Sequence, residues 1–413
     1  MRFLHTSDWH LGRSLHRADL REAQERFLEH LVETAREQKV NAVLVSGDVY
    51  DRAIPPLDAV RLFEDALGRL RDTGARVIVI SGNHDSARRL GFGAELIDKA
   101  GVHLRTRPGS LAAPVLLEDG HGPVAVYGIP YTEPALGLPG LAGGEAGEAS
   151  TETGEAPDGG HPARRSHHAV LEEAAARIAK DAATRGVTRT VVLAHAWVIG
   201  GEASASERDI RTERDSRRDR ESGVGGIGDV PLSVFDGFGY VALGHLHGQQ
   251  TLADRVRYSG SPLPYSFSER RHQKGSWLVE IDDGGKLAVE RVPAPVYRRL
   301  SVLRGRLDEL LASAEHDGVR EDFLAVTLTD LVRPDAAMDR LRRRFPHVLT
   351  LAFEPEGMTR DDRSYRARVA GRDDLSVAAE FVRHVRNTVP TAGERELLAA
   401  AFAAVGAVAR GEA

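Results

Sequence analysis

Short apolar runs alternate with longer amphipathic patterns in the first third of the chain. Residues 2–5, 41–46 and 76–81 form compact apolar runs with the length of buried strands. Between these runs, apolar side chains recur at helical spacing in two sets, which are Leu20, Ala23, Phe27, Leu28, Leu31, Val32 and Ala35, and then Leu57, Val60, Phe63, Leu67 and Leu70. The order strand, helix, strand, helix, strand predicts an α/β layered fold.

Further strands are predicted at residues 124–129, 188–193 and 240–243. Each of them is followed at once by polar residues that are capable of chemistry. Open α/β sheets bind their ligands at the carboxyl ends of strands, so this placement predicts a functional site there.

Two stretches break the pattern. Residues 133–165 are rich in Gly, Ala, Glu and Pro without periodicity, and residues 207–228 are dense in Arg, Asp, Glu and Gly. The first predicts a long surface insertion and the second a mobile, solvated loop. The alternative for the second is that the arginines between Arg208 and Arg220 contact a polyanion, which the interleaved acidic residues disfavour.

The pattern changes after about Pro293. Predicted strands at residues 300–303, 323–328 and 348–353 alternate with helical stretches, which indicates a small α+β domain. From Leu375 the chain is predicted to be helical, and this tail is too short to form a core alone, so it must pack on its own chain or on another protein. The predicted domains are residues 1–293 with insertions at 133–165 and 207–228, residues 294–374, and residues 375–413.

Composition limits the chemistry that the chain can perform. Its 413 residues include no cysteine, which excludes disulfides, zinc–thiolate sites and thiol nucleophiles. Any metal must therefore bind His, Asp, Glu or Asn, and the 17 histidines are the first residues to explain. A formal net charge of −6 argues against a passive DNA coat protein. No apolar run approaches the ~20 residues of a transmembrane helix and no secretory signal opens the chain, so we expect a cytoplasmic protein.

Five small motifs stand at or just after the ends of predicted strands. They are Asp8-Trp9-His10, Gly47-Asp48-Val49-Tyr50-Asp51-Arg52, Gly82-Asn83-His84-Asp85, His195, and Gly244-His245-Leu246-His247-Gly248. One such motif alone is a weak signal, whereas five in this order are a strong one. Gly47, Gly82 and Gly244 allow the backbone to turn sharply where a side chain would block the site.

Together the motifs offer seven oxygen and imidazole donors, which are Asp8, His10, Asp48, Asn83, His195, His245 and His247. Such donors without thiolates suit divalent ions such as Mn²⁺, with Mg²⁺ and Fe²⁺ as alternatives. Seven ligands are too many for one ion and fit two ions if one carboxylate, most naturally Asp48, bridges them. Two ions ~3.5–4 Å apart can clamp the oxygens of an in-line phosphoryl displacement and activate a water molecule. Turn-capping by Asp and Asn is the structural alternative, which the four matching histidines disfavour.

The five motifs resemble those of the calcineurin-like metallophosphoesterases. The opening run from His5 to Arg13, with Tyr258-Ser259-Gly260-Ser261-Pro262 and Ser266-Phe267-Ser268-Glu269, resembles more narrowly the bacterial nuclease subunits of that superfamily. The resemblance covers essentially the whole chain. It implies a layered metallophosphoesterase β-sandwich flanked by helices, a small α+β capping domain and a C-terminal helical segment that binds a partner.

The resemblance also implies roles for individual residues. One metal would bind Asp8, His10, Asp48 and His247, and the other would bind Asp48, Asn83, His195 and His245. His84 would be the catalytic histidine that contacts the scissile phosphate or protonates the leaving oxygen, and Asp85 would orient it by accepting from its ring.

The implied reaction is hydrolysis of DNA phosphodiesters, as an exonuclease on duplex ends and as an endonuclease on single strands or hairpins. The implied setting is DNA repair, recombination and replication at the nucleoid. The implied partners are DNA, an SMC-like coiled-coil ATPase bound by the C-terminal helices, and a second copy of the chain, giving a homodimer within a heterotetramer. Arg13, Arg17 and Arg52 are candidates for DNA phosphate contacts or for pairing with local carboxylates.

Other functions stay open at this point. A small-molecule or cyclic-nucleotide phosphodiesterase shares residues 82–85 and 244–247 but does not need the domain after Pro293 or the helical tail. A protein phosphatase is disfavoured because Asp85 stands where that class has Glu. A non-catalytic scaffold is disfavoured because all seven ligands and His84 are present.

Overall fold

The computed structural model describes residues 1–133, 166–208, 223–224, 227–356, 371–386 and 388–409. The chain divides into two compact units, Met1–Tyr297 and Arg298–Ala413. The predicted insertion at 133–165 lies outside the described residues except for Glu133, and so does most of the stretch at 207–228.

One six-stranded sheet contains the strands predicted near the N-terminus. Its central strands β4 and β5 are apolar and buried except for Ser46 and the exposed Arg76 at their ends, as is usual for parallel strands covered on both faces. β1, β4, β5 and β6 run parallel, β15 pairs antiparallel with β1, and β16 pairs antiparallel with β15. In spatial order the strands are β16 (Leu287–Pro293), β15 (Gly275–Ile281), β1 (Arg2–Thr6), β4 (Ala42–Ser46), β5 (Arg76–Ile80) and β6 (Val102–Arg105).

A second six-stranded sheet holds the other three predicted strands, of which β9 ends at the predicted ligand His195. β8, β9, β12 and β14 run parallel, whereas β7 and β13 are antiparallel edge strands. In spatial order the strands are β13 (Gln250–Ala253), β14 (Val256–Tyr258), β12 (Tyr240–Gly244), β9 (Arg189–His195), β8 (Gly122–Ile129) and β7 (Val115–Asp119).

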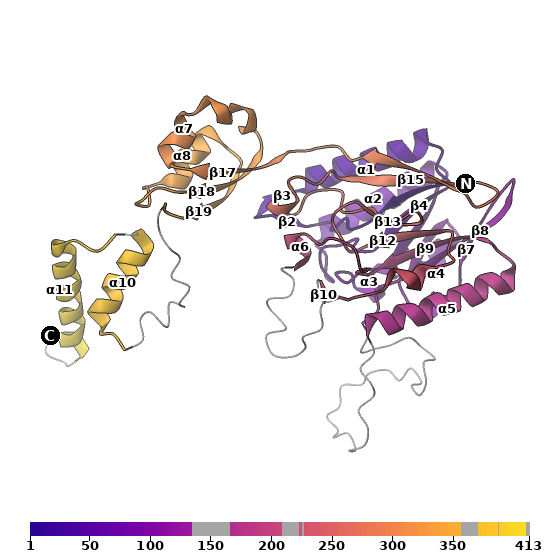
Figure 1. Ribbon diagram of the computed structural model, residues 1–413, viewed down its shortest axis with the longest axis horizontal. Coiled ribbons are helices and arrows are strands. Elements are labelled where there is room, and N and C mark those ends of the chain that lie inside the picture. Colours follow the sequence, from indigo (N-terminus) through magenta and orange to yellow (C-terminus); the bar gives the residue numbers. More distant parts are fainter. Residues whose placement is uncertain (134–165, 209–222, 225–226, 357–370, 387, 410–413) are drawn as a thin grey trace, which may run out of the picture. The chain divides into compact units, whose positions relative to one another are not determined.

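Helices cover the outer faces of the two sheets. The predicted helices are α1 (Arg21–Glu37) and α2 (Leu57–Asp72), and α5 (His167–Arg185) lies on the opposite side of the strands from α1 (Figure 1). The remaining short elements of this unit are β2 (Ser14–Leu15), β3 (Ala18–Asp19), α3 (Ala87–Leu90), α4 (Ala94–Asp98), α6 (Ala205–Arg208), β10 (Gly223–Val224), β11 (Ile227–Gly228) and the 3-10 turns η1 (Pro108–Ser110), η3 (Leu232–Phe235) and η4 (Phe267–Glu269).

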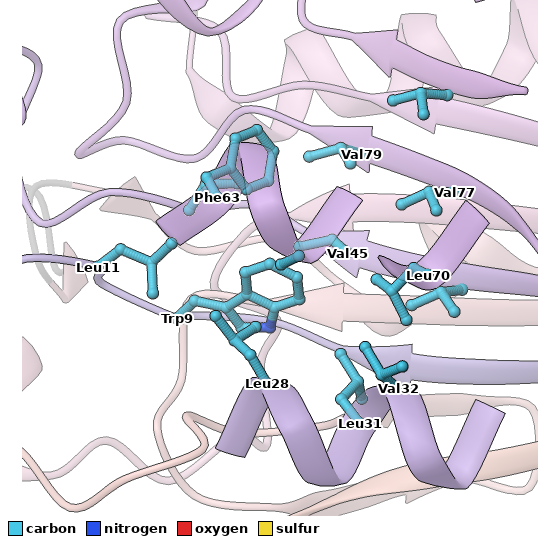
Figure 2. Close-up of a cluster of buried hydrophobic side chains, with 14 of the residues drawn as sticks. Trp9, Leu11, Leu28, Leu31, Val32, Val45, Phe63, Leu70, Val77 and Val79 are labelled. Atoms are coloured by element: carbon cyan, nitrogen blue, oxygen red, sulfur yellow. The ribbon is translucent and has the colours of Figure 1, made fainter. Parts of the chain in front are cut away.

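The core of the first unit is stacked in three layers. Alternate residues of β4 face different layers, since Val43 and Val45 contact α1 and α2 while Leu44 faces the second sheet. Figure 2 shows the first layer, in which Trp9 lies between the helices and the strands. Trp9 is fully buried and meets Phe27 and Phe63 edge to face, so it is a packing residue of the core. The predicted layered α/β fold is confirmed.

The second unit contains a small three-stranded parallel sheet with helical crossovers. Leu307 and Leu341 of its helices are buried against the sheet. The elements are β17 (Leu300–Gly305), α7 (Leu307–Ala312), the turn η5 (Ala314–Val319), β18 (Phe323–Leu328), α8 (Ala337–Arg344) and β19 (Val348–Phe353). The helical tail is also present, as α10 (Asp374–Arg386) and α11 (Ala392–Ala409), which contact each other.

No helix among the described residues is long and apolar enough to cross a membrane.

Candidate metal centre

Strands of both sheets deliver the predicted ligands to one place. Asp8 and His10 follow β1, Asp48 follows β4, Asn83 follows β5, His195 ends β9, and His245 and His247 follow β12. The two sheets touch here, because the Ser46 hydroxyl donates to the Ala242 carbonyl (2.8 Å) and His195 Nδ1 donates to the Ser46 carbonyl (2.9 Å). The carboxyl ends of parallel strands from two sheets therefore form a single site.

Asp48 lies between the two halves of the ligand set. Its Oδ2 is 3.7 Å from His10 Nε2 and 3.4 Å from His195 Nε2. Its other oxygen, Oδ1, accepts from the backbone N–H of His84 (2.9 Å), which fixes the carboxylate. This arrangement suits a carboxylate that bridges two ions through the side facing the two histidines.

Each half of the site contains a cluster of donors. Asp8, His10 and His247 have ligand atoms within 4.8 Å of one another, and so do Asp8, Asp48 and His195. Asn83 Oδ1 lies 2.9 Å from His195 Nε2, and the His245 ring is edge-on to the His195 ring at 5.4 Å between centroids. The structure thus brings all seven predicted ligands together.

The donors fit divalent cations. His10 Nε2 and His247 Nε2 are 3.1 Å apart, and both rings are buried. Because a bond from a metal to an imidazole nitrogen is about 2.0–2.1 Å long, two nitrogens this close could bind the same ion. Carboxylate, amide and imidazole donors without sulfur are those that Mn²⁺ and related ions accept.

The backbone of the ligand loops is held in an uncommon conformation. Asp8, His10, Asp48 and His245 have φ angles of 53°, 44°, 50° and 107°, a region that side-chain-bearing residues rarely occupy. Gly82 and Gly244 permit the close approach of the loops, because a Cβ on Gly82 would lie 2.1 Å from Asp48 Oδ1 and one on Gly244 would lie 1.9 Å from the Ser46 carbonyl oxygen. The prediction that a side chain would block the site is confirmed at these two glycines, and Gly47 adopts the predicted turn conformation with a φ of 87°.

Burial and neighbouring charges set the protonation of the carboxylates. Burial raises the pKa of Asp8 to about 6, with a further raising effect of the Asp48 carboxylate. Burial would also raise the pKa of Asp48, but the nearby His195, His84 and His10 rings hold it well below its ordinary value. Asp48 is therefore ionised over the physiological pH range.

The histidines divide into two groups. Burial lowers the pKa of His10 well below its ordinary value and, with His195, lowers the pKa of His245 to about 3. Burial acts in the same direction on His195, but Asp48 and Asp8 raise its pKa to about 9. The two aspartates thus favour a positive charge beside them, and a bound divalent cation would supply that charge.

His84 lies beside the ligands, and a hydrogen bond fixes its ring. Its Nδ1 donates to the Asp51 carbonyl oxygen (2.8 Å), and its ring stands edge-on to that of His10, with centroids 4.8 Å apart. His84 is only half-buried, which leaves its ring accessible from solvent.

The prediction that Asp85 orients His84 by accepting a hydrogen bond from its ring is wrong. Its carboxylate accepts from the backbone N–H groups of Val49 (3.1 Å), Tyr50 (2.9 Å) and Gly82 (2.9 Å), and the partner of the His84 ring is the Asp51 carbonyl instead. The physical reason is that three unpaired amides of the adjacent turns converge on Asp85. It therefore ties the two ligand loops together.

The three arginines proposed to contact DNA differ in their surroundings. Arg13 Nη1 lies 3.3 Å from Asp51 Oδ1, and its guanidinium stacks on the Tyr265 ring at 4.9 Å. Arg17 and Arg52 are exposed, and within the described part of the chain neither forms an ion pair. Arg13 thus pairs with a local carboxylate, which was the alternative to a DNA contact. Arg17 and Arg52 present their charges at the surface.

Sequence reasoning missed several side chains that surround His247. Glu207 was placed in a solvated loop, but it is buried and its Oε1 accepts from the His247 backbone N–H (2.6 Å). Glu269 Oε1 lies 3.2 Å from His247 Nδ1, and Lys274 Nζ is 2.5 Å from Glu269 Oε2. The only available signal was the run Ser266-Phe267-Ser268-Glu269, which carried a resemblance but no assigned role.

Two family models match parts of the chain. Residues 1–133 match the family model described as calcineurin-like phosphoesterase, a range that includes Asp8, His10, Asp48, Asn83 and His84. Residues 296–386 match the SbcD C-terminal domain model, which is described as the type 5 capsule protein repressor C-terminal domain. The first match supports a metal-dependent phosphoesterase.

Two solved structures are distantly similar to the chain. The protein TT1561 of Thermus thermophilus is 14% identical, with 70% of this chain and 98% of that chain covered and a TM-score of 0.34. A β-glucosidase from Exiguobacterium marinum is 10% identical, with 86% and 89% covered and a TM-score of 0.22. Neither likeness carries an argument about function.

Proposed function

We propose that the chain is an SbcD-like DNA nuclease subunit with a two-ion active site. It would hydrolyse phosphodiesters at duplex ends and within single strands or hairpins, in DNA repair, recombination and replication. The observation that carries the proposal is the convergence of seven oxygen and imidazole donors beside His84. The match of residues 296–386 to the SbcD C-terminal domain supports the nuclease over a small-molecule phosphodiesterase.

In this proposal the two ions share Asp48. The first would bind Asp8, His10, Asp48 and His247, and the second would bind Asp48, Asn83, His195 and His245, with Mn²⁺ as the proposed metal because of the mixed oxygen and imidazole donors. When bound, such ions activate water and neutralise negative charge on a phosphate.

His84 is proposed as the proton donor to the leaving oxygen. Because Nδ1 donates to the Asp51 carbonyl, the ring is oriented and Nε2 is the atom that exchanges a proton with substrate. The hydrogen bond from the His84 backbone N–H to Asp48 supports this role, because it fixes the backbone of the proposed catalytic residue relative to the proposed bridging carboxylate. Asp85 contributes by holding the loop.

The proposed partners are DNA, a second copy of the chain and an SbcC-type SMC-like ATPase. Residues 1–293 would be the nuclease domain, 294–374 the capping domain and 375–413 the segment that binds the ATPase. Exposed Leu57, Phe92 and Leu96 on the first unit are candidates for the homodimer contact. Exposed apolar side chains also occur on α10 and α11, at Phe381, Val385, Leu397, Phe402 and Val405.

The proposal is tested by incubating the purified chain with Mn²⁺ and end-labelled linear duplex or hairpin DNA, beside its His84→Ala variant. Bis-p-nitrophenyl phosphate and a cyclic nucleotide serve as small-diester controls. Cutting of DNA by the wild type and not by the variant is expected. Hydrolysis of small diesters alone, repeated with the ATPase and ATP present, would refute the nuclease and favour the small-molecule phosphodiesterase.

A further inference from the structure

We propose that two buried glutamates, Glu207 and Glu269, are positioning residues that hold His247 for a metal ion. The inference rests on the proposed function in one respect, because it assumes that His247 binds one of the two ions. It adds residues that lie outside the ligand motifs, on α6 and η4.

Glu269 acts on the ring of His247. A carboxylate oxygen only accepts, so the 3.2 Å contact between Glu269 Oε1 and His247 Nδ1 places the proton on Nδ1. The lone pair then belongs to Nε2, which faces His10 Nε2 at 3.1 Å. A carboxylate behind a metal-binding histidine both orients the ring and makes it a stronger donor.

Glu207 acts on the backbone of the same residue. Its Oε1 accepts from the His247 N–H at 2.6 Å, while the Ser204 hydroxyl donates to its Oε2. Lys274 Nζ donates to the His247 carbonyl oxygen (2.8 Å) and also contacts Glu269 Oε2 (2.5 Å). The N–H, the carbonyl and the ring of His247 are therefore each bound by a different charged side chain.

The burial of these charges points to a function beyond local folding. Glu269 and Glu207 are 0% and 1% exposed, and carboxylates are rarely buried to this extent without paired charges. Two segments that are distant in sequence, one containing Glu207 and the other containing Glu269 and Lys274, converge on one ligand. This arrangement fixes the position of His247 and its strength as a donor. The ring contact is made at Nδ1, so Nε2 is left for the proposed metal ion.

The test measures Mn²⁺ binding by calorimetry and by the electron paramagnetic resonance of unbound Mn²⁺, with no substrate present. Glu269→Gln, which keeps the side-chain shape and removes the charge, is introduced into two backgrounds. His245→Ala leaves the first ion site intact and His10→Ala leaves the second intact. Glu280→Gln, an exposed glutamate that pairs with Arg2, is the matched control.

We expect Glu269→Gln to weaken Mn²⁺ binding about 10–100-fold in the His245→Ala background and to leave it unchanged in the His10→Ala background. If Glu269→Gln does not fold, Glu207→Ala takes its place with the same expected pattern. Unchanged binding in the first background, or equal weakening in both, would overturn the proposal.

The readout separates this inference from the nuclease assignment. A chain that binds Mn²⁺ and shows the expected pattern but cuts no DNA, even with the ATPase and ATP present, would refute the nuclease and support the role of the glutamates. If the wild-type chain cuts DNA but Glu269→Gln changes Mn²⁺ binding equally in both backgrounds or in neither, the nuclease is supported and the role of the glutamates is overturned.

Discussion

Removal of the Asp85 carboxylate is expected to destabilise the first unit and the loop that carries His84. In Asp85→Ala, the backbone N–H groups of Val49, Tyr50 and Gly82 lose their acceptor together. These three residues are buried, so their amides have little access to water in the native state. The variant therefore tests whether Asp85 ties the two ligand loops to each other.

The expected magnitude follows from the number of amides. A buried N–H left without an acceptor costs about 1–3 kcal/mol, and Asp85 is itself only half-buried, so water can replace part of what is lost. We expect Asp85→Ala to lower the free energy of unfolding by about 3–5 kcal/mol. Asp85→Asn keeps one acceptor oxygen, which can serve Val49 and Gly82 but not Tyr50, and should lose about 1–2 kcal/mol.

Urea unfolding followed by tryptophan fluorescence suits this measurement. Trp9, Trp197 and Trp277 are the chain's three tryptophans and all lie within Met1–Tyr297, so the signal reports the first unit alone. Asp65→Ala on α2 is the matched control, because Asp65 is exposed and its ion pair with Arg69 spans one helical turn. The control should change stability by no more than about 0.5 kcal/mol.

Two results would refute the reasoning. A loss below about 1 kcal/mol in Asp85→Ala would show that the three amides do not depend on the carboxylate. A loss in Asp85→Asn as large as that in Asp85→Ala would show that the charge matters and not the number of acceptors.

Three further predictions concern the bridge, the close approach of the loops and acid stability. Asp48→Ala should release both ions, since Asp48 Oδ2 faces both halves of the site, and retention of two ions in elemental analysis would contradict this. Gly82→Ala should abolish tight Mn²⁺ binding in a calorimetric titration because its Cβ would displace Asp48, whereas Gly68→Ala, which meets open space, should bind as the wild type does. Hydrogen bonds from Arg189 hold the pKa of Asp119 below its ordinary value of 3.8, so its stabilising effect is present above about pH 4 and lost as the pH falls further. The free energy of unfolding, measured by urea titration, should accordingly fall more between pH 5 and pH 3 in the wild type than in Asp119→Asn. Equal falls would contradict a stabilising Arg189–Asp119 pair.

Hydrophobic periodicity predicted the elements that bury one clear face. α1 and α2 have large apolar side chains such as Phe27 and Phe63 against the first sheet, and their ends differ from the prediction by only a few residues. α5 was not predicted, because alanines such as Ala174 and Ala182 make up much of its buried face and contrast weakly with the polar side. The half-exposed strand β16 was missed for a similar reason. The division of the strands into two sheets depends on long-range pairing that no local pattern encodes.

The convergence of the candidate ligands could be predicted because the ends of the strands meet, whereas the residues behind them could not be predicted. Glu207 stands in a run of charged residues, a composition that predicts solvent exposure. Its burial is decided by the amide of His247, 40 residues away in sequence. The Asp51 carbonyl is invisible to any side-chain motif, although it sets the orientation of His84.

The unusual backbone of the ligand loops explains why such long-range partners are required. A residue other than glycine at positive φ costs about 1–3 kcal/mol unless its surroundings fix it, and Asp8, His10 and Asp48 all adopt this conformation. Backbone bonds from Asp8 to the Gly47 carbonyl (3.0 Å) and from His10 to the Asp48 carbonyl (2.9 Å) join the loop after β1 to the loop after β4. The loops therefore hold one another in a shape that neither would keep alone. Because that shape points the carboxylates and imidazoles inward, the strain and the metal-binding geometry have one structural origin, and changes at the loop contacts should affect stability and metal affinity together.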